Sequence, residues 1–171
     1  NGKTTVASLL YEVFKGLGNS CGLLSTVAIK YGDLSLEATH TTPDALVVQQ
    51  HLQKMVEAGV AYCFMEVSSH GIAQHRVSGL HFAGGVFTNL SHDHLDYHGS
   101  FKNYRDIKKI FFDLLPAKAF ALTNVDDKNG AFMLQNTKAK KKEYALQRAA
   151  DYQVKILEQQ FSGMLLTINK Q

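Results

Sequence analysis

The chain has 171 residues, about one domain's worth of sequence, with 45% hydrophobic and 19% charged residues, a composition that excludes a disordered or fibrous protein. Its net charge of +3 is too small to indicate nucleic-acid binding, and two cysteines are too few for a disulfide framework. Because no apolar run reaches the roughly 20 residues of a membrane span and no export leader is evident, we expect a cytoplasmic protein without a membrane anchor.

Predicted helices and strands alternate along the chain. This alternation predicts an α/β fold that is doubly wound, with a mostly parallel sheet covered by helices on both faces. The first helix is predicted from Lys3 to about Phe14, and a buried strand follows at residues 21–26. The apolar residues expected to face inward from this helix are Val6, Leu9, Leu10 and Val13.

Residues 27–37 form a predicted hairpin that turns around Gly32, and residues 43–58 form a second helix, because proline suits a first helical turn. A continuous apolar run at residues 60–67, broken only by Glu66, predicts a central strand that is buried on both faces. The apolar stripe expected on the second helix consists of Val48, Leu52, Met55 and Val56.

Two more buried strands are predicted at residues 82–88 and 117–123, with a helix at residues 101–115 between them. The elements expected after Asn124 are a short helix, a solvated lysine-rich loop at residues 138–142, and strands near residues 143–146, 153–158 and 164–168. The chain has no internal repeat and no linker, which predicts one domain. Because it starts inside a phosphate-loop signature, we expect it to be part of a larger protein.

That phosphate-loop signature lies at the start of the first predicted helix. Gly2 lets the backbone approach the phosphates of a nucleotide, Lys3 can bind the β- and γ-phosphates, and the Thr4 hydroxyl can bind magnesium. A bare Gly-Lys-Thr also occurs by chance, so this segment alone indicates nucleotide binding only weakly.

A second group of polar residues follows the apolar run of residues 60–67. Glu66 ends that run, and a buried carboxylate is costly unless it is paired or binds a metal; the alternative is a glutamate that emerges into solvent. Ligands of open α/β sheets bind beyond the carboxyl ends of strands, which is where Gln74 and Arg76 are expected. The guanidinium of Arg76 is suited to a ligand carboxylate.

Histidines are concentrated after the strand predicted at residues 82–88. His92, His94 and His98 lie beside Asp93 and Asp96, and histidine with carboxylate can hold a divalent metal. The spacing does not match a zinc motif, and any single histidine among them could be structural.

Two neighbouring lysines occupy different faces of the helix predicted at residues 101–115. At 100° per residue, Lys109 points almost opposite to the apolar direction and is expected to face water. Lys108 lies at the rim of the buried face, where a lysine either extends its amine to solvent or serves a ligand. The apolar direction is set by Tyr104, Ile107, Ile110, Phe111, Leu114 and Leu115.

Together, these segments resemble the central ATPase domain of the Mur ligases. The similarity runs from residue 1 to about residue 113 and is weaker at residues 123–127. The matching segments are residues 1–5, 41–44, 65–71, 74–76 and 88–99, and the Tyr104-to-Lys108 spacing. The phosphate loop and Asp93-His94 are shared with folylpolyglutamate synthetases. The sequence Glu-Val-Ser-Ser-His-Gly followed by Gln-His-Arg is more specific, and indicates the branch that adds the third residue of the peptidoglycan stem peptide.

The resemblance implies a role for each matching residue. The residues that would bind ATP are Gly2, Lys3, Thr4, Thr5 and Asn89. Those that would bind the nucleotide-sugar dipeptide are Thr41, Thr42, Ser68, Gln74 and Arg76. Two magnesium ions would be bound by Thr4, Glu66, His94 and Lys108. The implied catalytic residues are Lys3, His94 and Lys108, the last as a carbamate formed with carbon dioxide. The family often has asparagine where this chain has His40.

The resemblance also implies the reaction and the domain organisation. A substrate carboxylate would attack the γ-phosphate of ATP to give an acyl phosphate, and the amine of a diamino acid would displace the phosphate to form an amide. The substrates would be UDP-N-acetylmuramoyl-L-alanyl-D-glutamate and a diamino acid, meso-diaminopimelate in preference to L-lysine. Residues 1–171 would be the central domain of a monomeric three-domain ligase, without its N-terminal UDP-binding and C-terminal domains.

Three alternatives stay open from the sequence. Another ligase of the same superfamily, of the folylpolyglutamate or cyanophycin synthetase type, would share the phosphate loop. An ordinary phosphate-loop kinase or NTPase would need only that loop. A histidine-rich metal-binding module would account for the histidines of residues 70–98 without any nucleotide chemistry.

Overall fold

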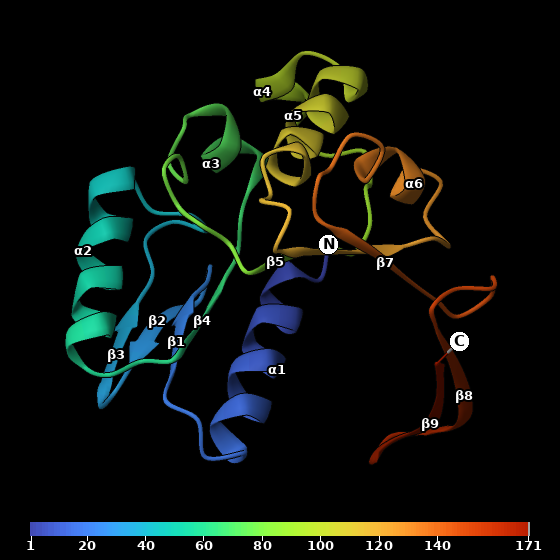
Figure 1. Cartoon of the computed structure of the whole chain (residues 1–171), viewed down its shortest axis with the longest axis horizontal. Helices are drawn as coiled ribbons and strands as arrows, with labels where there is room; N and C mark the ends of the chain where they lie inside the picture. The colour runs from blue at the N-terminus through green and yellow to red at the C-terminus, as the bar shows by residue number, and fades with distance from the viewer. Residues whose placement is uncertain (171) are drawn as a thin grey trace. The chain divides into compact units, whose positions relative to one another are not determined.

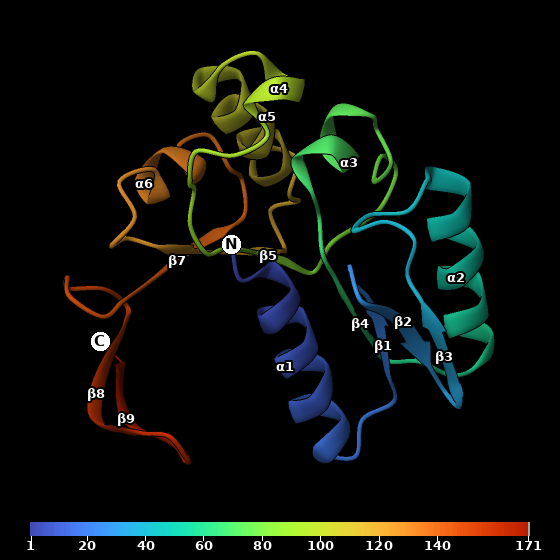
Figure 2. The same cartoon turned by 180° about the vertical axis from the view of Figure 1, so that it is seen from behind.

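The computed structural model describes residues 1–170, which form two compact units (Figure 1, Figure 2). The N-terminal unit comprises residues 2–80, and the C-terminal unit comprises Asn1 together with the chain from His81 onward. Each unit has its own sheet and its own buried core. None of the helices within residues 1–170 has the length and apolar character that crossing a bilayer requires.

A four-stranded sheet of order β3-β2-β1-β4 is the frame of the N-terminal unit. Its strands are β1 (Cys21–Leu24), β2 (Ala28–Tyr31), β3 (Leu34–Glu37) and β4 (Tyr62–Met65). Strands β1 and β4 are parallel, whereas β2 is antiparallel to both β1 and β3. The predicted hairpin is therefore confirmed, and Gly32 in its turn has a left-handed φ of 53°, which glycine adopts at little cost.

Helices cover both faces of this sheet, as the doubly wound prediction requires. The helices of the unit are α1 (Lys3–Gly16), α2 (Ala45–Glu57) and α3 (Ser69–Ala73). Side chains alternate between the faces of β1, so Leu23 packs with Tyr11 of α1 while Leu24 packs with Val48 of α2. The sheet thus lies between α1 and α2.

Two expectations for this unit are wrong. The predicted central strand is the edge strand β4, which pairs in this sheet with β1 alone, and Tyr62 is 46% exposed. On α1 the buried pair is Ala7 and Tyr11, spaced i and i+4 toward β1, whereas Leu9 and Val13 are more than half exposed.

A five-stranded sheet of order β5-β6-β7-β8-β9 is the frame of the C-terminal unit. Its strands are β5 (Gly84–Phe87), β6 (Phe120–Asn124), β7 (Lys140–Ala145), β8 (Tyr152–Gln160) and β9 (Gly163–Lys170). Strands β5 to β8 pair in parallel, and β9 is antiparallel to β8. The expectation that the lysine-rich segment forms a loop is wrong, because residues 140–142 lie in β7 and pair with β6.

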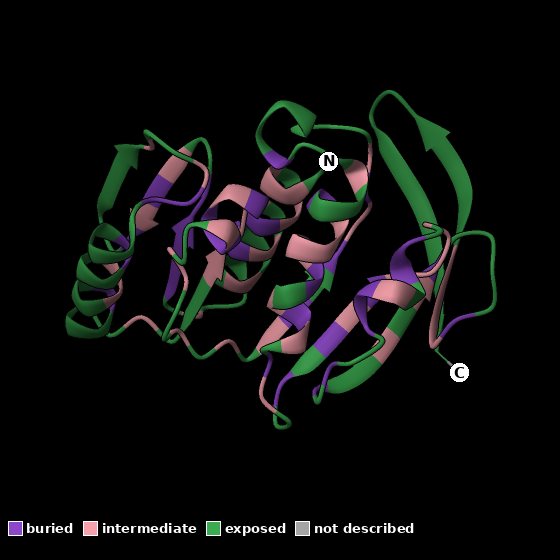
Figure 3. Ribbon diagram, turned by 90° about the horizontal axis from the view of Figure 1, so that it is seen from above, coloured by how far each residue is buried: buried purple, intermediate pink, exposed green. Residues whose placement is uncertain are grey.

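The core of the C-terminal unit lies between its sheet and its helices. The helices are α4 (Leu95–His98), α5 (Phe101–Asp113) and α6 (Gly130–Met133). Phe112 of α5 and Met133 of α6 are buried in one cluster with Phe87 of β5 and Ala121 of β6. In contrast, the β8–β9 hairpin is exposed along residues 155–170 (Figure 3).

Candidate active site

The candidate residues divide between the two units. The N-terminal unit contains Gly2, Lys3, Thr4, Thr5, Thr41, Thr42, Glu66, Ser68, Gln74 and Arg76. The C-terminal unit contains Asn89, His94 and Lys108.

The phosphate-loop residues form the beginning of α1. Gly2 precedes the helix with φ 80° and ψ 2°, a left-handed conformation that suits glycine, and its carbonyl accepts the first helical bond from the Val6 N–H at 3.0 Å. Lys3 and Thr4 are half-buried, and Thr5 is exposed. The N–H groups of a first helical turn have no partner within the helix and carry partial positive charge, so this end of α1 can accept an anion.

Glu66 is the buried carboxylate of this unit, at 2% exposure one residue beyond β4. Its Oε2 accepts the hydroxyl protons of Thr4 at 3.0 Å and Thr26 at 3.1 Å, and its Oε1 accepts the Thr26 N–H at 2.7 Å. The alternative that Glu66 emerges into solvent is therefore wrong. Three donors satisfy a charge that would otherwise be too costly to bury.

This arrangement is compatible with a magnesium ligand set. The Thr4 hydroxyl and the Glu66 carboxylate are 3.0 Å apart, and both are the hard oxygen ligands that Mg²⁺ prefers. Magnesium sites commonly use one or two protein oxygens and complete the shell with water and substrate phosphates. Within residues 1–170 there is no cluster of three or more histidine, cysteine, aspartate or glutamate side chains arranged for a metal.

Thr42 connects the end of β4 to α3. Its hydroxyl donates to the Glu66 carbonyl at 2.9 Å and accepts the Ser68 N–H at 3.0 Å, while the Ser68 hydroxyl accepts the Gly71 N–H at 3.0 Å and caps α3. Gly71 is required here, because a Cβ would lie 2.8 Å from Cγ2 of Thr42. Beside this network, the hydroxyl oxygens of Thr41 and Thr26 lie 3.1 Å apart, within hydrogen-bond distance.

Gln74 and Arg76 lie together at the carboxyl end of α3. Nε and Nη2 of Arg76 donate to Oε1 of Gln74 at 2.9 and 2.6 Å, and Nη1 of Arg76 donates to the Thr42 carbonyl at 2.7 Å. The guanidinium is thus held in place by two other candidate residues. These bonds use three of its five N–H groups and leave one on each terminal nitrogen for a ligand.

In the C-terminal unit, Asn89 follows β5 in a loop that is held from two sides. Nδ2 of Asn89 donates to the Asn1 carbonyl at 3.0 Å, so Asn89 contacts the first residue of the phosphate-loop sequence. The loop is fixed by Asn124, which donates to the Thr88 carbonyl at 3.0 Å, and by Asp127, which accepts the Leu90 N–H at 2.8 Å. The weakly similar segment at residues 123–127 therefore positions Asn89.

His94 and Lys108 both contact the ring of Tyr104. The ring centroids of His94 and Tyr104 are 5.9 Å apart, and Nζ of Lys108 lies 5.0 Å from the Tyr104 centroid. His94 has a left-handed φ of 53°, and its N–H donates to Oδ1 of Asp93 at 2.9 Å. Tyr104 is 5% exposed, and burial, with a smaller contribution from the charge of Asp93, raises its pKa to about 12. Tyr104 thus connects the histidine segment to the lysine.

The expectation that Lys109 faces water is wrong. Lys109 is 7% exposed, and its Nζ lies 2.7 Å from both carboxylate oxygens of Asp113, one turn further along α5. The cause is α6, which packs Phe132 against this side of α5. The ring centroid of Phe132 lies 5.7 Å from Nζ of Lys109 and 3.9 Å from the guanidinium carbon of Arg105. The helix is therefore covered on a second side, whereas Ile110, expected to be inward, is 44% exposed.

Sequence reasoning missed three residues of these networks. Thr26 donates twice to Glu66 from 40 residues away, and no sequence signal indicates that pairing. From its sequence position, Tyr104 was expected only to face the apolar side of the helix and to match the spacing to Lys108 found in the family, although a residue four positions before Lys108 lies on the same helix face. His75, between Gln74 and Arg76, has a left-handed φ of 56° that a sequence pattern does not reveal.

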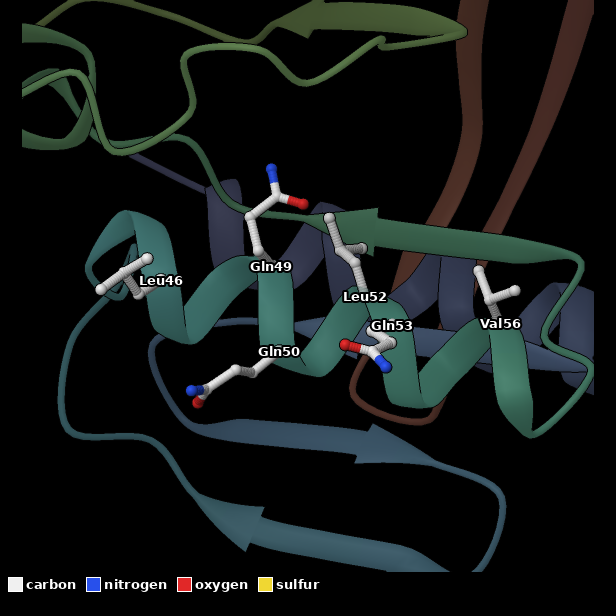
Figure 4. A pocket seen from close by; sticks show the side chains of 6 residues that line it. All are labelled: Leu46, Gln49, Gln50, Leu52, Gln53 and Val56. Carbon is white, nitrogen blue, oxygen red and sulfur yellow. The ribbon is translucent and has the colours of Figure 1, made fainter.

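The α2 surface contains an open hollow of about 450 Å³ that none of the candidate residues line (Figure 4). Its lining residues are Leu46, Gln49, Gln50, Leu52, Gln53 and Val56. Val56, expected in the buried stripe of this helix, is 76% exposed here, whereas Val48 and Met55 are buried as predicted.

Comparisons with known proteins point to one family of ligases. A ligase of Parabacteroides distasonis named UDP-N-acetylmuramoyl-L-alanyl-D-glutamate--2,6-diaminopimelate ligase is 57% identical over 169 residues, 99% of this chain and 35% of that protein. The ligase of the same name from Phocaeicola vulgatus is 54% identical over the same shares of the two chains. A solved structure of a ligase of that name superposes with a TM-score of 0.89 at 30% identity, and covers 100% of this chain and 36% of the other.

The chain thus spans about a third of the length of the curated relatives it matches. The family described as the Mur ligase middle domain matches residues 1–171, which is the whole sequence. The chain therefore belongs to the Mur ligase family, through the middle domain of that family.

Proposed function

We propose that this chain is the central ATP-binding domain of a ligase that adds meso-diaminopimelate to UDP-N-acetylmuramoyl-L-alanyl-D-glutamate. The observation that supports this most strongly is the identity of 57% and 54% with two ligases named for that reaction. Both names specify 2,6-diaminopimelate, which favours it over L-lysine. The full enzyme would also contain the N-terminal UDP-binding domain and the C-terminal domain.

In the proposed mechanism, the N-terminal unit binds the phosphates of ATP, which is a substrate. The first-turn N–H groups of α1 and the Lys3 ammonium would hold the β- and γ-phosphates. Thr4 and Glu66 would hold the first magnesium ion, and Thr26 keeps the Glu66 carboxylate oriented through two hydrogen bonds. Bound magnesium would neutralise charge on the transferring phosphate.

Three further residues with proposed roles lie in the C-terminal unit. His94 would bind magnesium, and Asn89 would contact the nucleotide. Lys108 would act as a carbamate: its neutral amine attacks the carbon of carbon dioxide, the new N–C bond forms, and the nitrogen releases a proton to solvent. A cationic side chain thereby becomes an anion with two oxygen ligands, which magnesium prefers to an ammonium group.

The dipeptide substrate would bind at the carboxyl end of β4. Arg76 retains one N–H on each terminal nitrogen, enough for a bidentate carboxylate. Thr41, Thr42, Ser68 and Gln74 would contribute further contacts to the dipeptide. With one carboxylate of the D-glutamate held by Arg76, the other would attack the γ-phosphate to give an acyl phosphate and ADP. The amine of diaminopimelate would then displace phosphate and form the amide, with the protein contributing mainly position and charge neutralisation.

The test is phosphate release by the full-length enzyme. We expect release only when ATP, UDP-N-acetylmuramoyl-L-alanyl-D-glutamate and meso-diaminopimelate are all present, and little when L-lysine replaces diaminopimelate. Steady release with ATP alone would instead identify an ordinary phosphate-loop NTPase. Release that requires a folate and glutamate, but not the nucleotide-sugar dipeptide, would identify a folylpolyglutamate synthetase.

A further inference from the structure

His75 has a backbone conformation that is unusual for its residue type. Its φ of 56° is left-handed, and within residues 1–170 it shares a positive φ with only one other non-glycine residue, His94. Left-handed backbone is disfavoured for residues with a Cβ, although histidine tolerates it better than most. Such a conformation persists only where the surrounding structure requires it.

The left-handed conformation of His75 is required by the turn that ends α3. The Arg76 N–H donates to the Gly71 carbonyl at 2.8 Å, and the His75 N–H donates to the Ile72 carbonyl at 3.1 Å. These two bonds define a Schellman motif in which Gln74 is the C-cap and His75 is the left-handed residue after it. Glycine usually occupies that position, because it has no Cβ.

The Schellman turn determines where Gln74 and Arg76 point. If residue 75 became right-handed, α3 would continue, and each following side chain would rotate by about 100° per residue around the helix axis. Arg76 would then lose its N–H bond to Gly71, and its guanidinium would be turned away from the Thr42 carbonyl. The three side-chain bonds of Arg76, at 2.6 to 2.9 Å, therefore depend on the conformation of His75.

We propose that His75 is a positioning residue for substrate binding, and that it holds Gln74 and Arg76 in their binding geometry through its left-handed backbone. This inference rests on the proposed function, in which those two residues bind the nucleotide-sugar dipeptide. The imidazole supports the turn from its exposed side, since Nδ1 of His75 lies 3.4 Å from the Ser78 hydroxyl. The backbone conformation, rather than the imidazole, is the feature that Arg76 requires.

The experiment compares substitutions at residue 75 in the full-length enzyme. His75→Val places a β-branched residue in a left-handed position, and we expect the KM for UDP-N-acetylmuramoyl-L-alanyl-D-glutamate to rise about tenfold. His75→Gly permits the same backbone, so this KM should stay within about twofold of the natural enzyme. In both variants the KM for ATP and the kcat at saturating dipeptide should change by less than about twofold, because the proposed mechanism gives residue 75 no contact with the ATP phosphates or the reacting atoms.

Gly79→Val is the matched control for general strain. Gly79 lies in the same unit with a φ of 81° and open space where a Cβ would lie, so valine there strains the backbone without entering the Schellman turn. We expect it to lower stability but to leave the dipeptide KM within about twofold. A tenfold rise in that KM for Gly79→Val, no rise for His75→Val, or an equal rise for His75→Gly would each overturn the proposal.

Arg76→Lys separates this proposal from the proposed function. Lysine keeps the charge but cannot bind a carboxylate with two parallel N–H groups, so the dipeptide should bind about tenfold more weakly while ATP binding is unchanged. If Arg76→Lys leaves dipeptide affinity intact, the assignment of the substrate site fails. If Arg76→Lys weakens the dipeptide but His75→Val does not, only the role of His75 fails.

Discussion

The buried ion pair on α5 leads to an asymmetric prediction about stability. Lys109 and Asp113 are joined by two contacts of 2.7 Å, but their side chains are exposed to different extents, 8% and 31%. Removing Asp113 leaves a cation that water hardly reaches. Removing Lys109 leaves a carboxylate that can be partly rehydrated. The two single substitutions should therefore differ in cost.

The magnitudes follow from the exposure of the charge left behind. Breaking a fully buried pair costs about 3–5 kcal/mol, and an exposed i,i+4 pair contributes only about 0.3–0.5 kcal/mol. Asp113→Asn should cost about 3 kcal/mol of unfolding free energy, near the buried limit. Lys109→Met, which retains an apolar stem beside Phe132, should cost about 1 kcal/mol of unfolding free energy. The double variant Lys109→Met/Asp113→Asn should recover most of the stability that Asp113→Asn loses.

The assay is urea unfolding of the 171-residue chain, followed by circular dichroism. Lys102→Ala is the control, because Lys102 is exposed on the same helix, and it should change the unfolding free energy by less than about 0.5 kcal/mol. If Asp113→Asn proves no more destabilising than Lys102→Ala, the reasoning from burial is refuted. If the double variant is as unstable as the sum of the single losses, the two charges are not coupled.

Three further predictions concern activity and pH. In the full-length enzyme, Lys108→Ala should nearly abolish ligation in a coupled phosphate assay, whereas Lys102→Ala should retain it. Short carboxylic acids should restore part of the rate that Lys108→Ala loses. Near-normal turnover of Lys108→Ala in bicarbonate-free buffer would count against the carbamate. The isolated 171-residue chain should form no amide bond, and detectable product by mass spectrometry would contradict the three-domain assignment. Because the pKa of Tyr104 is raised from 10.0 to about 12, its contribution to stability is complete below pH 10 and is lost as the pH rises toward 12. Tyr104→Phe should remove that loss from an alkaline denaturation curve, and an unchanged curve would show that Tyr104 is not its source.

Individual helices and strands could be predicted from the sequence where a single local pattern determines them. Apolar runs indicated the buried strands, the Gly32 turn indicated the β2–β3 hairpin, and Pro43 indicated the start of α2 to within two residues. Asp44, rather than proline, caps that helix by accepting the Leu46 N–H at 3.1 Å. These features depend on neighbours in the sequence, so sequence reasoning reaches them.

The predictions were wrong where distant segments of the chain determine which faces of a helix or strand are buried. A helical wheel assigns one buried direction to α5, but α6 contacts a second direction, and Lys109 is buried there against Phe132. Likewise, an apolar run such as β4 does not reveal whether its strand is central or at an edge, because strand order depends on distant segments. The loop expected at Lys140 and its neighbours is wrong for the same reason, since their pairing partner is β6.

Glu66 shows how the fold resolves a choice that the sequence leaves open. An acidic residue at the end of an apolar strand is either solvated or satisfied internally, and only the second state leaves it buried and oriented. The donors that satisfy it are Thr4 and Thr26, which lie 62 and 40 residues away, so no local pattern contains them. Two of those bonds come from Thr26, which the proposed function does not otherwise use. In the proposed site, a magnesium ion would replace the Thr4 proton on Glu66 while Thr26 continues to hold the carboxylate, so binding the metal would need little rearrangement.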